Sequence, residues 1–582
     1  MPAPSGAGEA VRLKRWSEAG NAALCAALCF FFGALVIRPW RGSLDVPYLY
    51  LGDANLYQAS IKGVLDHGWY WHNASLGAPG QAQLFDFPSL GGDPLNVLAI
   101  KFLGLFSSDS AVVMNVFFLL TFPAVGLAAY LVLRRLMLSV PVAIACSILY
   151  ALLPYHFTRG EGHLLLSAYY AVPLGAYLVL SVLVDRALFA GRRVALGTFA
   201  LCAVIAFASA SYYYSAFTVV LVAAAAVLRG LALRSWRPLV NGGGVVAVIA
   251  ALSLFTLLPS FVYWASHGTN PGVGHRSTFE SELYALKFAQ LVLPIEGHRI
   301  GKLAHARETY DSWFPRTEAS ITTPLGIVAA LGFVGLLGLC LVQLASPGRR
   351  LAPALYGNAG LAALLALLFA WVGGLAVFVA ALEPQIRSWN RLSIFIGFFA
   401  LLGVGLVLDV LVARWRPLVG ALLLCGVLTV GLLDQTSSSY EPHYDALAAD
   451  YRSDGDFVSD IQARLPDGAM VFQLPYIRFP EAPPAQGMVD YDLMRGYLHS
   501  DDLRWSYGHI KGRNDDPNVT LADAKGPELV RDAKAAGFDG IYIDRFGYAD
   551  KAEALESELV DALGHPPLVS RNGRLSFFQL TG

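Results

Sequence analysis

The feature that most constrains this chain is a series of long apolar runs without charged residues, which recurs along residues 20–434 of the 582-residue sequence. A helix needs about 20 consecutive apolar residues to cross the hydrocarbon core of a bilayer. Hydrophobic residues make up 55% of the chain and charged residues only 15%, which is a poor composition for a soluble protein. The pattern predicts an α-helical polytopic membrane protein.

The apolar runs divide into about eleven predicted spans. The longest charge-free run, residues 194–228, is too long for one helix and is interrupted by the segment SASYYYS. We therefore expect this run to cross the membrane twice. The predicted spans are 20–37, 111–133, 137–155, 164–184, 194–209, 213–228, 239–264, 321–345, 358–382, 392–411 and 417–433.

Basic residues between the spans predict the orientation, because Lys and Arg are enriched in cytoplasmic loops. The short connections on one side carry only Arg159, Arg387 and Arg391. This predicts a cytoplasmic N-terminus at residues 1–19 and an extracytoplasmic C-terminus, in a cell (inner) membrane. The basic residues expected on the cytoplasmic side are Arg12, Lys14, Arg15, Arg134, Arg135, Arg186, Arg192, Arg193, Arg229, Arg234, Arg237, Arg349, Arg350, Arg414 and Arg416.

The predicted orientation divides the chain into a transmembrane domain, residues 20–434, and an outer domain, residues 435–582. The outer domain contains strand-like MVFQL, GIYI and LSFFQL and a helix-like PELVRDAKAAG. Strands that alternate with helices predict a small extracytoplasmic α/β domain. The connections expected on the same side are the long loops 38–110 and 265–320 and the short segments 156–163 and 383–391.

The first outer loop is rich in carboxylates. Asp53 precedes a segment whose apolar residues recur at helical spacing, which predicts an amphipathic helix in the membrane interface. Asp53 could be the N-cap of that helix or a chemical group, and the two roles are compatible. Asp93 before Pro94 has the form of an N-cap and is expected to be structural. Asp66 is expected to be solvated. Asp86 could be a structural or a chemical group. The remaining acid of the loop is Asp45.

The segment HFTRGEGH, residues 156–163, supplies two possible metal ligands. Glu161 and His163 could hold a divalent cation if a carboxylate of the first loop faces them. The alternative is a solvated turn in which Glu161 pairs with Arg159. A divalent metal is therefore a possible cofactor.

Basic residues of the later outer segments are candidate phosphate contacts, since Arg can bind a phosphate through two N–H groups. For any single residue the alternative is contact with lipid headgroups. The most suggestive pair lies in the short segment 383–391, where positive charge is disfavoured. The middle of the long loop, LYALKFAQLVLPI, predicts a second interfacial helix. The phosphate-binding candidates are Arg276, Lys287, Arg299, Arg387 and Arg391.

Several segments resemble the GT-C superfamily of membrane glycosyltransferases. LGDANLYQ, GWYWHNASLGAP, FDFP and GGDPLN look like the opening loop of a bacterial branch of that superfamily. RGYLHSDDLRWSYGHIKGR and GFDGIYIDRFGY look like the same branch. A first span, a long outer loop with an early acid, a scaffold of many spans and an exported C-terminal domain are also similar to the superfamily.

The resemblance implies an inverting transferase that moves a sugar from a polyprenyl-phosphate donor to an extracytoplasmic acceptor. The acceptor would be a cell-surface glycan such as a polysaccharide of the cell envelope, a lipid or a protein. A first-loop Asp would be the base, and cations or a metal would stabilise the leaving phosphate. Many of these enzymes carry adjacent acids in this loop, whereas Asp53 stands alone, so Asp53 and Asp45 remain alternatives.

Two other classes of function are also possible. The chain could be a transporter or flippase of lipid-linked glycan, or a non-enzymatic envelope assembly protein. The predicted spans are almost free of ionisable residues and show no inverted repeat, which disfavours a transporter. No Walker or dinucleotide glycine motif appears, as expected for a donor that is not a nucleotide. The expected partners are the lipid-linked sugar, the acceptor and membrane lipids, with no nucleic acid.

Overall fold

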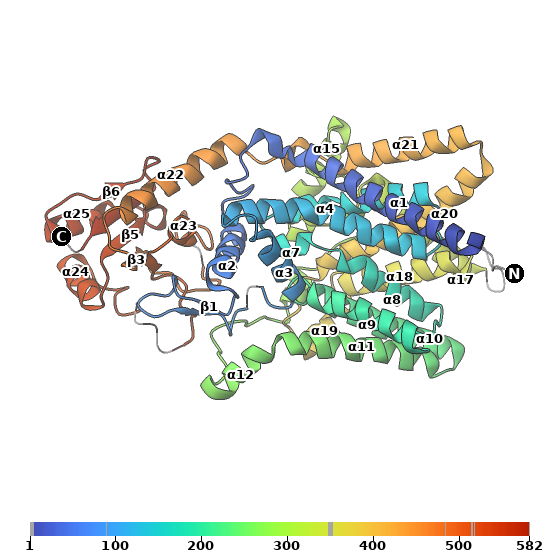
Figure 1. The fold of residues 1–582 in the computed structure, drawn as a ribbon, viewed down its shortest axis with the longest axis horizontal. Coiled ribbons are helices and arrows are strands. Elements are labelled where there is room, and N and C mark those ends of the chain that lie inside the picture. Colours follow the sequence, from blue (N-terminus) through green and yellow to red (C-terminus); the bar gives the residue numbers. More distant parts are fainter. Residues whose placement is uncertain are drawn as a thin grey trace.

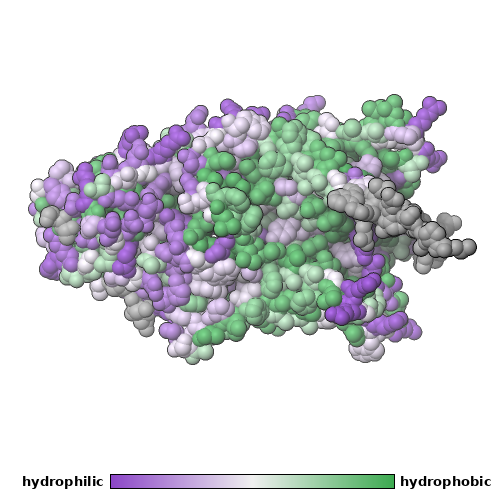
Figure 2. Space-filling view, viewed as in Figure 1, coloured by the Kyte–Doolittle hydropathy of each residue, from purple (hydrophilic) through white to green (hydrophobic). Residues whose placement is uncertain are grey.

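The computed structural model describes residues 5–88, 90–346, 353–483, 485–513, 516 and 518–580, with side chains from residue 17 onward. A bundle of long helices forms one part, and a smaller region of strands and helices at the C-terminal end forms the other (Figure 1). In the view of Figure 2 the surface of the bundle is mainly apolar, and that of the C-terminal region is mainly polar. The predicted cytoplasmic residues Arg349 and Arg350, and the side chains of Arg12, Lys14 and Arg15, lie outside this description.

Among the described residues, eight helices are long and apolar enough to cross a membrane. Helices α8, α9 and α18, of 13, 16 and 17 residues, fall in three further predicted spans and are shorter. The chain is thus a multi-pass membrane protein. The helices of the bundle are α1 (Ser5–Ile37), α4 (Ser110–Arg135), α5 (Val140–Ala151), α6 (Pro154–Arg159), α7 (Leu164–Ser167), α8 (Ala171–Leu183), α9 (Arg192–Phe207), α10 (Tyr213–Leu233), α11 (Arg237–Thr256), α12 (Leu258–His267), α17 (Ile327–Ala345), α18 (Ala354–Ala370), α19 (Ala376–Leu382), α20 (Ser393–Arg414) and α21 (Pro417–Gln435).

The long apolar run at 194–228 is divided between α9 and α10, as expected. The break contains three consecutive non-glycine residues with positive φ, Ala210, Ser211 and Tyr212. This conformation is strained for side chains with a Cβ and persists only when the surroundings hold it. Asp93 holds it, because its carboxylate accepts the N–H groups of Ala210 at 2.9 Å and Ser211 at 2.7 Å. Asp93 is therefore structural, and it also precedes α3 (Pro94–Leu103) as predicted.

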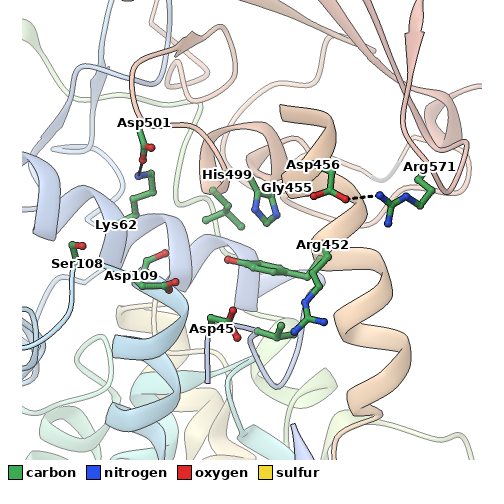
Figure 3. Close-up of a pocket in the computed structure, with 14 residues that line it drawn as sticks. Asp45, Lys62, Ser108, Asp109, Arg452, Gly455, Asp456, His499, Asp501 and Arg571 are labelled. Atoms are coloured by element: carbon green, nitrogen blue, oxygen red, sulfur yellow. Dashed lines mark ion pairs between the residues drawn. The ribbon is translucent and has the colours of Figure 1, made fainter. Parts of the chain in front are cut away.

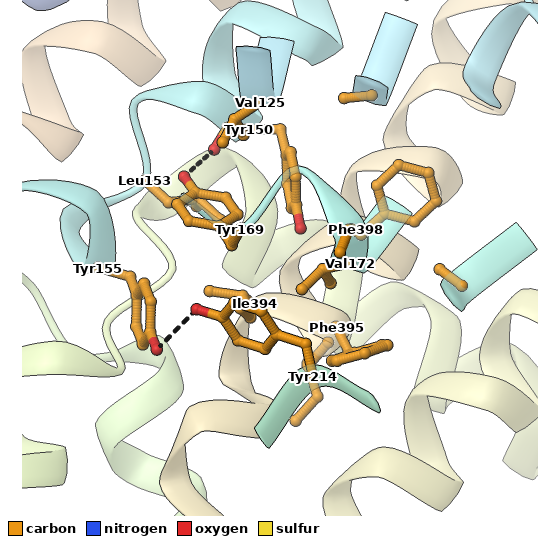
Figure 4. Close-up of a cluster of buried hydrophobic side chains, with 14 of the residues drawn as sticks. Val125, Tyr150, Leu153, Tyr155, Tyr169, Val172, Tyr214, Ile394, Phe395 and Phe398 are labelled. Atoms are coloured by element: carbon orange, nitrogen blue, oxygen red, sulfur yellow. Dashed lines mark hydrogen bonds between the residues drawn. The ribbon is translucent and has the colours of Figure 1, made fainter. Parts of the chain in front are cut away.

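A cluster of buried aromatic residues lies within the bundle (Figure 4). The hydroxyls of Tyr155 and Tyr214 are 3.3 Å apart, and Tyr169 donates to the carbonyl of Tyr150 at 2.8 Å. Buried tyrosines are enriched in such bonds because an unpaired buried hydroxyl is costly. The contact between Tyr155 and Tyr214 joins the start of α6 to the start of α10.

The first outer loop folds into α2 (Asp53–His67), a short hairpin of β1 (His72–Asn73) and β2 (Ala82–Gln83), and α3. Helix α2 packs against α4 and against α23 (Met494–Leu498) of the C-terminal region. Most of its residues from Ala54 to Val64 are buried. The expected amphipathic helix is present, but it is enclosed by other elements and does not lie freely in the membrane interface.

The second long outer loop differs from the prediction. Its middle forms two short helices, α13 (Glu280–Leu283) and α14 (Phe288–Val292), in place of one interfacial helix. Between them, the Leu286 N–H donates to the Ala370 carbonyl at 2.8 Å, and Val372 donates back to Leu286 at 3.2 Å. This backbone pairing with the end of α18 interrupts the helix. The loop continues as α15 (Gly301–Trp313) and α16 (Glu318–Thr322).

The C-terminal region contains a five-stranded mixed sheet with strand order β4-β3-β5-β7-β6. Strand β3 runs parallel to β4 and β5, and β7 runs antiparallel to β5 and β6. The predicted strands and the predicted helix are present. The strands are β3 (Met470–Leu474), β4 (Arg504–Trp505), β5 (Gly540–Asp544), β6 (Leu568–Val569) and β7 (Leu575–Gln579); the helices are α22 (Tyr444–Gln462), α23, α24 (Gly526–Ala535) and α25 (Glu553–Leu563); and the 3-10 helices of the chain are η1 (Pro39–Arg41), η2 (Trp389–Leu392), η3 (Ser438–Tyr440) and η4 (Arg545–Gly547).

An ion pair ties the first outer loop to the C-terminal region. Arg513 binds both carboxylate oxygens of Asp86 at 2.7 Å. Trp264 and Asn270 donate to the same carboxylate at 2.8 and 3.0 Å. Asp86, which the sequence left undecided, is thus a structural link between three segments.

Candidate functional site

Asp53 is the first residue of α2, at the junction between the bundle and the C-terminal region. The residue before it, Gly52, occupies the N-cap position with φ 57°, which glycine adopts readily. The Asp53 side chain is therefore not the N-cap and is left for other contacts. Its Oδ2 lies 3.7 Å from Nε2 of His163, which belongs to the predicted outer segment 156–163.

The surroundings of Asp53 make its carboxylate a stronger base than an ordinary one. Burial raises its pKa to about 6, and the negative charges of Asp490 and Glu481 add to this effect. Arg391 and Arg387 act in the opposite direction. A carboxylate whose pKa approaches neutrality is suited to accept a proton in a reaction at neutral pH. Its charged neighbours come from both the bundle and the C-terminal region.

His163 is neutral beside Asp53 at neutral pH. Burial lowers the pKa of its imidazole to about 3, and the charges of Arg159 and Arg391 contribute. The distance of 3.7 Å to Asp53 also exceeds that of a normal hydrogen bond. The two side chains are thus neighbours and not an ion pair.

Arg391 is the buried cation of the site. Its residue is only 9% exposed, and its guanidinium lies 4.0 Å above the ring of Tyr213. Within the described part of the chain its Nε has no hydrogen-bond partner and no carboxylate forms an ion pair with it. A buried charge without a partner is costly, so this position favours an anionic ligand.

Two further arginines of the predicted phosphate set lie close to one another and already form ion pairs. Arg387 donates to Glu280 at 2.6 Å, and Arg276 donates to Glu481 at 2.5 Å. Burial raises the pKa of Glu280, but the hydrogen bond from Arg387, an N–H of Ser277 and the charges of both arginines lower it overall. Each arginine keeps N–H groups that these bonds do not use.

A second buried ion pair supports the segment that carries Arg391. Arg159, 2% exposed, donates to Glu318, and Asn390 donates to the other oxygen of that carboxylate at 3.2 Å. Burial raises the pKa of Glu318, but Arg159 and Arg391 outweigh this and lower it to about 2. Arg159 thus pairs with Glu318 and not with Glu161.

Glu161 faces away from this cluster. Its Oε2 accepts the N–H of Leu49 at 3.0 Å, and burial raises its pKa to about 8. It lines a cavity of about 710 Å³ near the end of α1 and the start of α4, which Arg159 also lines. Asp53 and His163 alone offer fewer ligands than the three protein ligands of a catalytic zinc site. In the described residues, no three or more His, Cys, Asp or Glu side chains are grouped to hold a metal ion.

Three other predicted site residues also lie elsewhere. Asp45 is exposed and lines a different pocket. The Lys287 amine lies 5.4 Å from the centre of the Phe314 ring. Arg299 donates to the carbonyl and hydroxyl of Thr436, at 3.1 and 3.2 Å.

Sequence reasoning gave no role to several residues around Asp53. Tyr213 follows the strained turn before α10, and its only signal was the polar interruption of a long apolar run. Glu318 had no distinguishing context in the long loop. Glu481 and Asp490 belong to the C-terminal region, far from the first loop in sequence. Together these residues form a charged cluster that contains a basic carboxylate and a buried arginine without an ion-pair partner among the described residues.

No protein-family model matches the chain, and no curated protein sequence matches it significantly. Among solved structures, it is similar to the arabinofuranosyltransferase AftD from Mycobacteria, with 15% identity and a TM-score of 0.46 over 98% of this chain. The chain spans 40% of the length of AftD.

Two further solved structures are similar to the chain. One is ArnT from Cupriavidus metallidurans bound to undecaprenyl phosphate, with 14% identity, a TM-score of 0.47 and coverage of 95% of this chain and 98% of ArnT. The other is the oligosaccharyltransferase of Archaeoglobus fulgidus, with 13% identity, a TM-score of 0.39 and coverage of 96% of this chain and 74% of that one.

Proposed function

We propose that this protein is an inverting membrane glycosyltransferase that moves a sugar from a polyprenyl-phosphate donor to an extracytoplasmic acceptor. The observation that carries the proposal is that Asp53, whose pKa is raised to about 6, lies near the buried Arg391. Arg391 forms no ion pair among the described residues. A base and an anion-binding cation close to one another are the two groups that transfer from a sugar phosphate requires.

In the proposed reaction, Asp53 accepts the proton of an acceptor hydroxyl while the hydroxyl oxygen attacks the anomeric carbon. The bond between that carbon and the phosphate oxygen breaks, and polyprenyl phosphate leaves with the electron pair. Retention would need a second carboxylate placed as a nucleophile against the anomeric carbon. A single displacement with Asp53 as the base inverts the anomeric carbon. Asp53 is the proposed base in place of Asp45, which lines another pocket.

The proposed seat for the leaving phosphate is Arg391, assisted by Arg387 and Arg276. Arg391 can form new hydrogen bonds without losing an existing ion pair. The other two arginines can use the N–H groups that do not bond Glu280 or Glu481. Charge-assisted hydrogen bonds of this kind are about twice as strong as neutral ones. The positions of Lys287 and Arg299 favour roles in packing and in anchoring the loop.

The proposed location of the site is the extracytoplasmic face of the cell membrane. Basic residues in the predicted cytoplasmic connections support this orientation. A donor carried by a membrane lipid suits this side, because the lipid delivers the sugar within the bilayer. The acceptor would be a cell-surface glycan, a lipid or a protein, and the C-terminal region would be an extracytoplasmic domain.

The test is to reconstitute the purified protein in lipid vesicles with synthetic polyprenyl-phosphate sugars. We expect release of free polyprenyl phosphate together with a glycosylated product, detected by mass spectrometry. Movement of the intact donor across the vesicle membrane without cleavage would support the transporter alternative and refute the proposal.

A further inference from the structure

A second polar pocket lies between the first outer loop and the C-terminal region, apart from Asp53. It has a volume of about 530 Å³, within the range of about 300–1,000 Å³ that small-molecule sites occupy. Figure 3 shows side chains from the first loop, α2, the start of α4 and α22 around one space. The residues that matter below are Asp45, Lys62, Asp109, Tyr451, Arg452 and His499.

His499 presents a hydrogen-bond acceptor to this pocket. The Tyr50 hydroxyl donates its one proton to Asp454 at 2.9 Å, so towards His499 it can only accept. The 3.0 Å contact between Tyr50 and Nε2 of His499 therefore requires the proton on Nε2. Burial lowers the pKa of His499 to about 3, so Nδ1 carries no proton. Nδ1 has no hydrogen-bond partner among the described residues.

Other groups around the pocket have bonding capacity to spare. Asp109 caps α4 with Oδ1 alone, through the N–H groups of Ala111 and Val112, which leaves Oδ2 free of these bonds. The Tyr451 hydroxyl accepts a hydrogen bond from Gln58 at 2.8 Å and keeps its own proton for a further acceptor. In the described residues, Asp45 and Arg452 form no ion pair.

The remaining charges of the pocket neutralise one another. Lys62 lies 3.1 Å from Asp66 and 4.0 Å from Asp501. Arg571 lies 2.9 Å from Asp456. Hydrogen-bond donors and hydrogen-bond acceptors therefore both line this pocket, and neither positive nor negative charge is in large excess. This chemistry suits a neutral molecule with many hydroxyl groups, since each hydroxyl both donates and accepts.

We infer that this pocket binds sugar units of a neutral glycan acceptor that do not themselves react. The inference rests on the proposed function, because it names the acceptor class of the same enzyme. Residues Asp53 and Lys62 are nine positions apart on α2, which is about 14 Å along a helix. A glycan that occupies both places must therefore be longer than a single sugar. A lipid phosphate is disfavoured by the carboxylates Asp45, Asp109 and Asp456.

The test uses full-length protein in lipid nanodiscs on an array of neutral oligosaccharides. We expect binding to a subset of glycans that Arg452→Ala and Asp45→Asn each weaken about tenfold or more. The control Arg531→Ala changes an exposed arginine of α24 that pairs with its own helix, and it should bind normally.

The outcomes separate this inference from the proposed function. Glycan binding that Arg452→Ala weakens, without any donor cleavage, would support the glycan pocket and refute the proposed transferase activity. Donor cleavage with no neutral glycan bound would refute the glycan-binding inference and leave the proposed transferase activity in place. Donor cleavage with glycan binding unchanged in Arg452→Ala would have the same meaning. Weakened binding of anionic lipid vesicles by Arg452→Ala, in place of glycans, would also overturn the inference.

Discussion

Replacing Arg391 by methionine should weaken donor binding without destabilising the protein. The side chain is buried, and no carboxylate among the described residues depends on it as an ion-pair partner. Glu318 keeps Arg159, and Asn390 keeps Glu318. Removing a buried charge that lacks a protein partner relieves a desolvation cost. We therefore expect the melting temperature to stay the same or rise.

The expected loss of affinity follows from the charge. Two unit charges 4 Å apart attract by about 4 kcal/mol at an effective dielectric constant of about 20. Part of this is offset by desolvation of the phosphate, so we expect a net loss of about 2–4 kcal/mol. Each 1.36 kcal/mol is a factor of about ten, so the Kd should rise by about 30- to 1,000-fold. Arg391→Lys keeps the charge but loses the planar group above Tyr213, and should be intermediate.

The assay is the affinity for polyprenyl phosphate itself, measured by native mass spectrometry on wild-type protein, Arg391→Met, Arg391→Lys and Arg299→Ala. Arg299 is exposed and bonded to Thr436, so its variant is the matched control and should bind as wild type. Arg391 also lowers the pKa of Asp53. If the ammonium group in Arg391→Lys lies farther from Asp53 than the guanidinium does, the pKa of Asp53 rises. The pH of half-maximal activity of this variant should then rise as well. A wild-type Kd in Arg391→Met would refute the phosphate seat.

Three further predictions follow from the charged contacts. Transfer activity should rise with pH and be half-maximal near pH 6, because Asp53 accepts a proton only when deprotonated and its pKa is raised to about 6; a flat profile between pH 5 and 7 in the chemical step would argue against this base. Glu318→Gln should destabilise the protein by about 3 kcal/mol or more, because Arg159 is left buried without its charged partner; thermal unfolding measures this, and an unchanged melting temperature would contradict it. Asp86→Ala should loosen the C-terminal region, so that limited proteolysis cleaves near Arg513 faster than in wild type, whereas equal rates would show that other contacts suffice.

Local patterns predicted most of the elements. Apolar runs placed a helix in every predicted span, because a membrane-spanning helix must be apolar along its whole length. The polar interruption at 208–212 correctly separated two helices. Alternating apolar residues placed β3 and β7 in the C-terminal region. The segments 38–110, 156–163 and 383–391 lie close together at Asp53, His163 and Arg391.

The remaining features depend on contacts between residues far apart in the chain. The helix expected across 283–295 is broken because Leu286 pairs with the end of α18, and a local pattern does not contain that pairing. Arg159 pairs with Glu318, 159 positions away, in place of its neighbour Glu161. Glu481 and Asp490 approach Asp53 only because the C-terminal region docks on the first loop.

The same reason explains the division of the predicted phosphate set. Arg387 and Arg391 lie near Asp53, and Arg276 binds its neighbour Glu481. Lys287 and Arg299 instead contact Phe314 and Thr436. All five have the same side-chain chemistry in outer segments, so residue type alone does not separate them. Asp45 likewise lies in the loop after the first predicted span, as Asp53 does, but it lines the second polar pocket.

The most direct test of the account is the turnover of Asp53→Asn in a transfer assay with a polyprenyl-phosphate sugar donor. Asp66→Asn is the matched control, because Asp66 lies on the same helix and its one ion pair among the described residues is with Lys62 at 3.1 Å. We predict that Asp53→Asn slows transfer by about 10²- to 10⁴-fold with the affinity for polyprenyl phosphate retained, and that Asp66→Asn transfers normally. Transfer at the wild-type rate by folded Asp53→Asn protein would contradict the account.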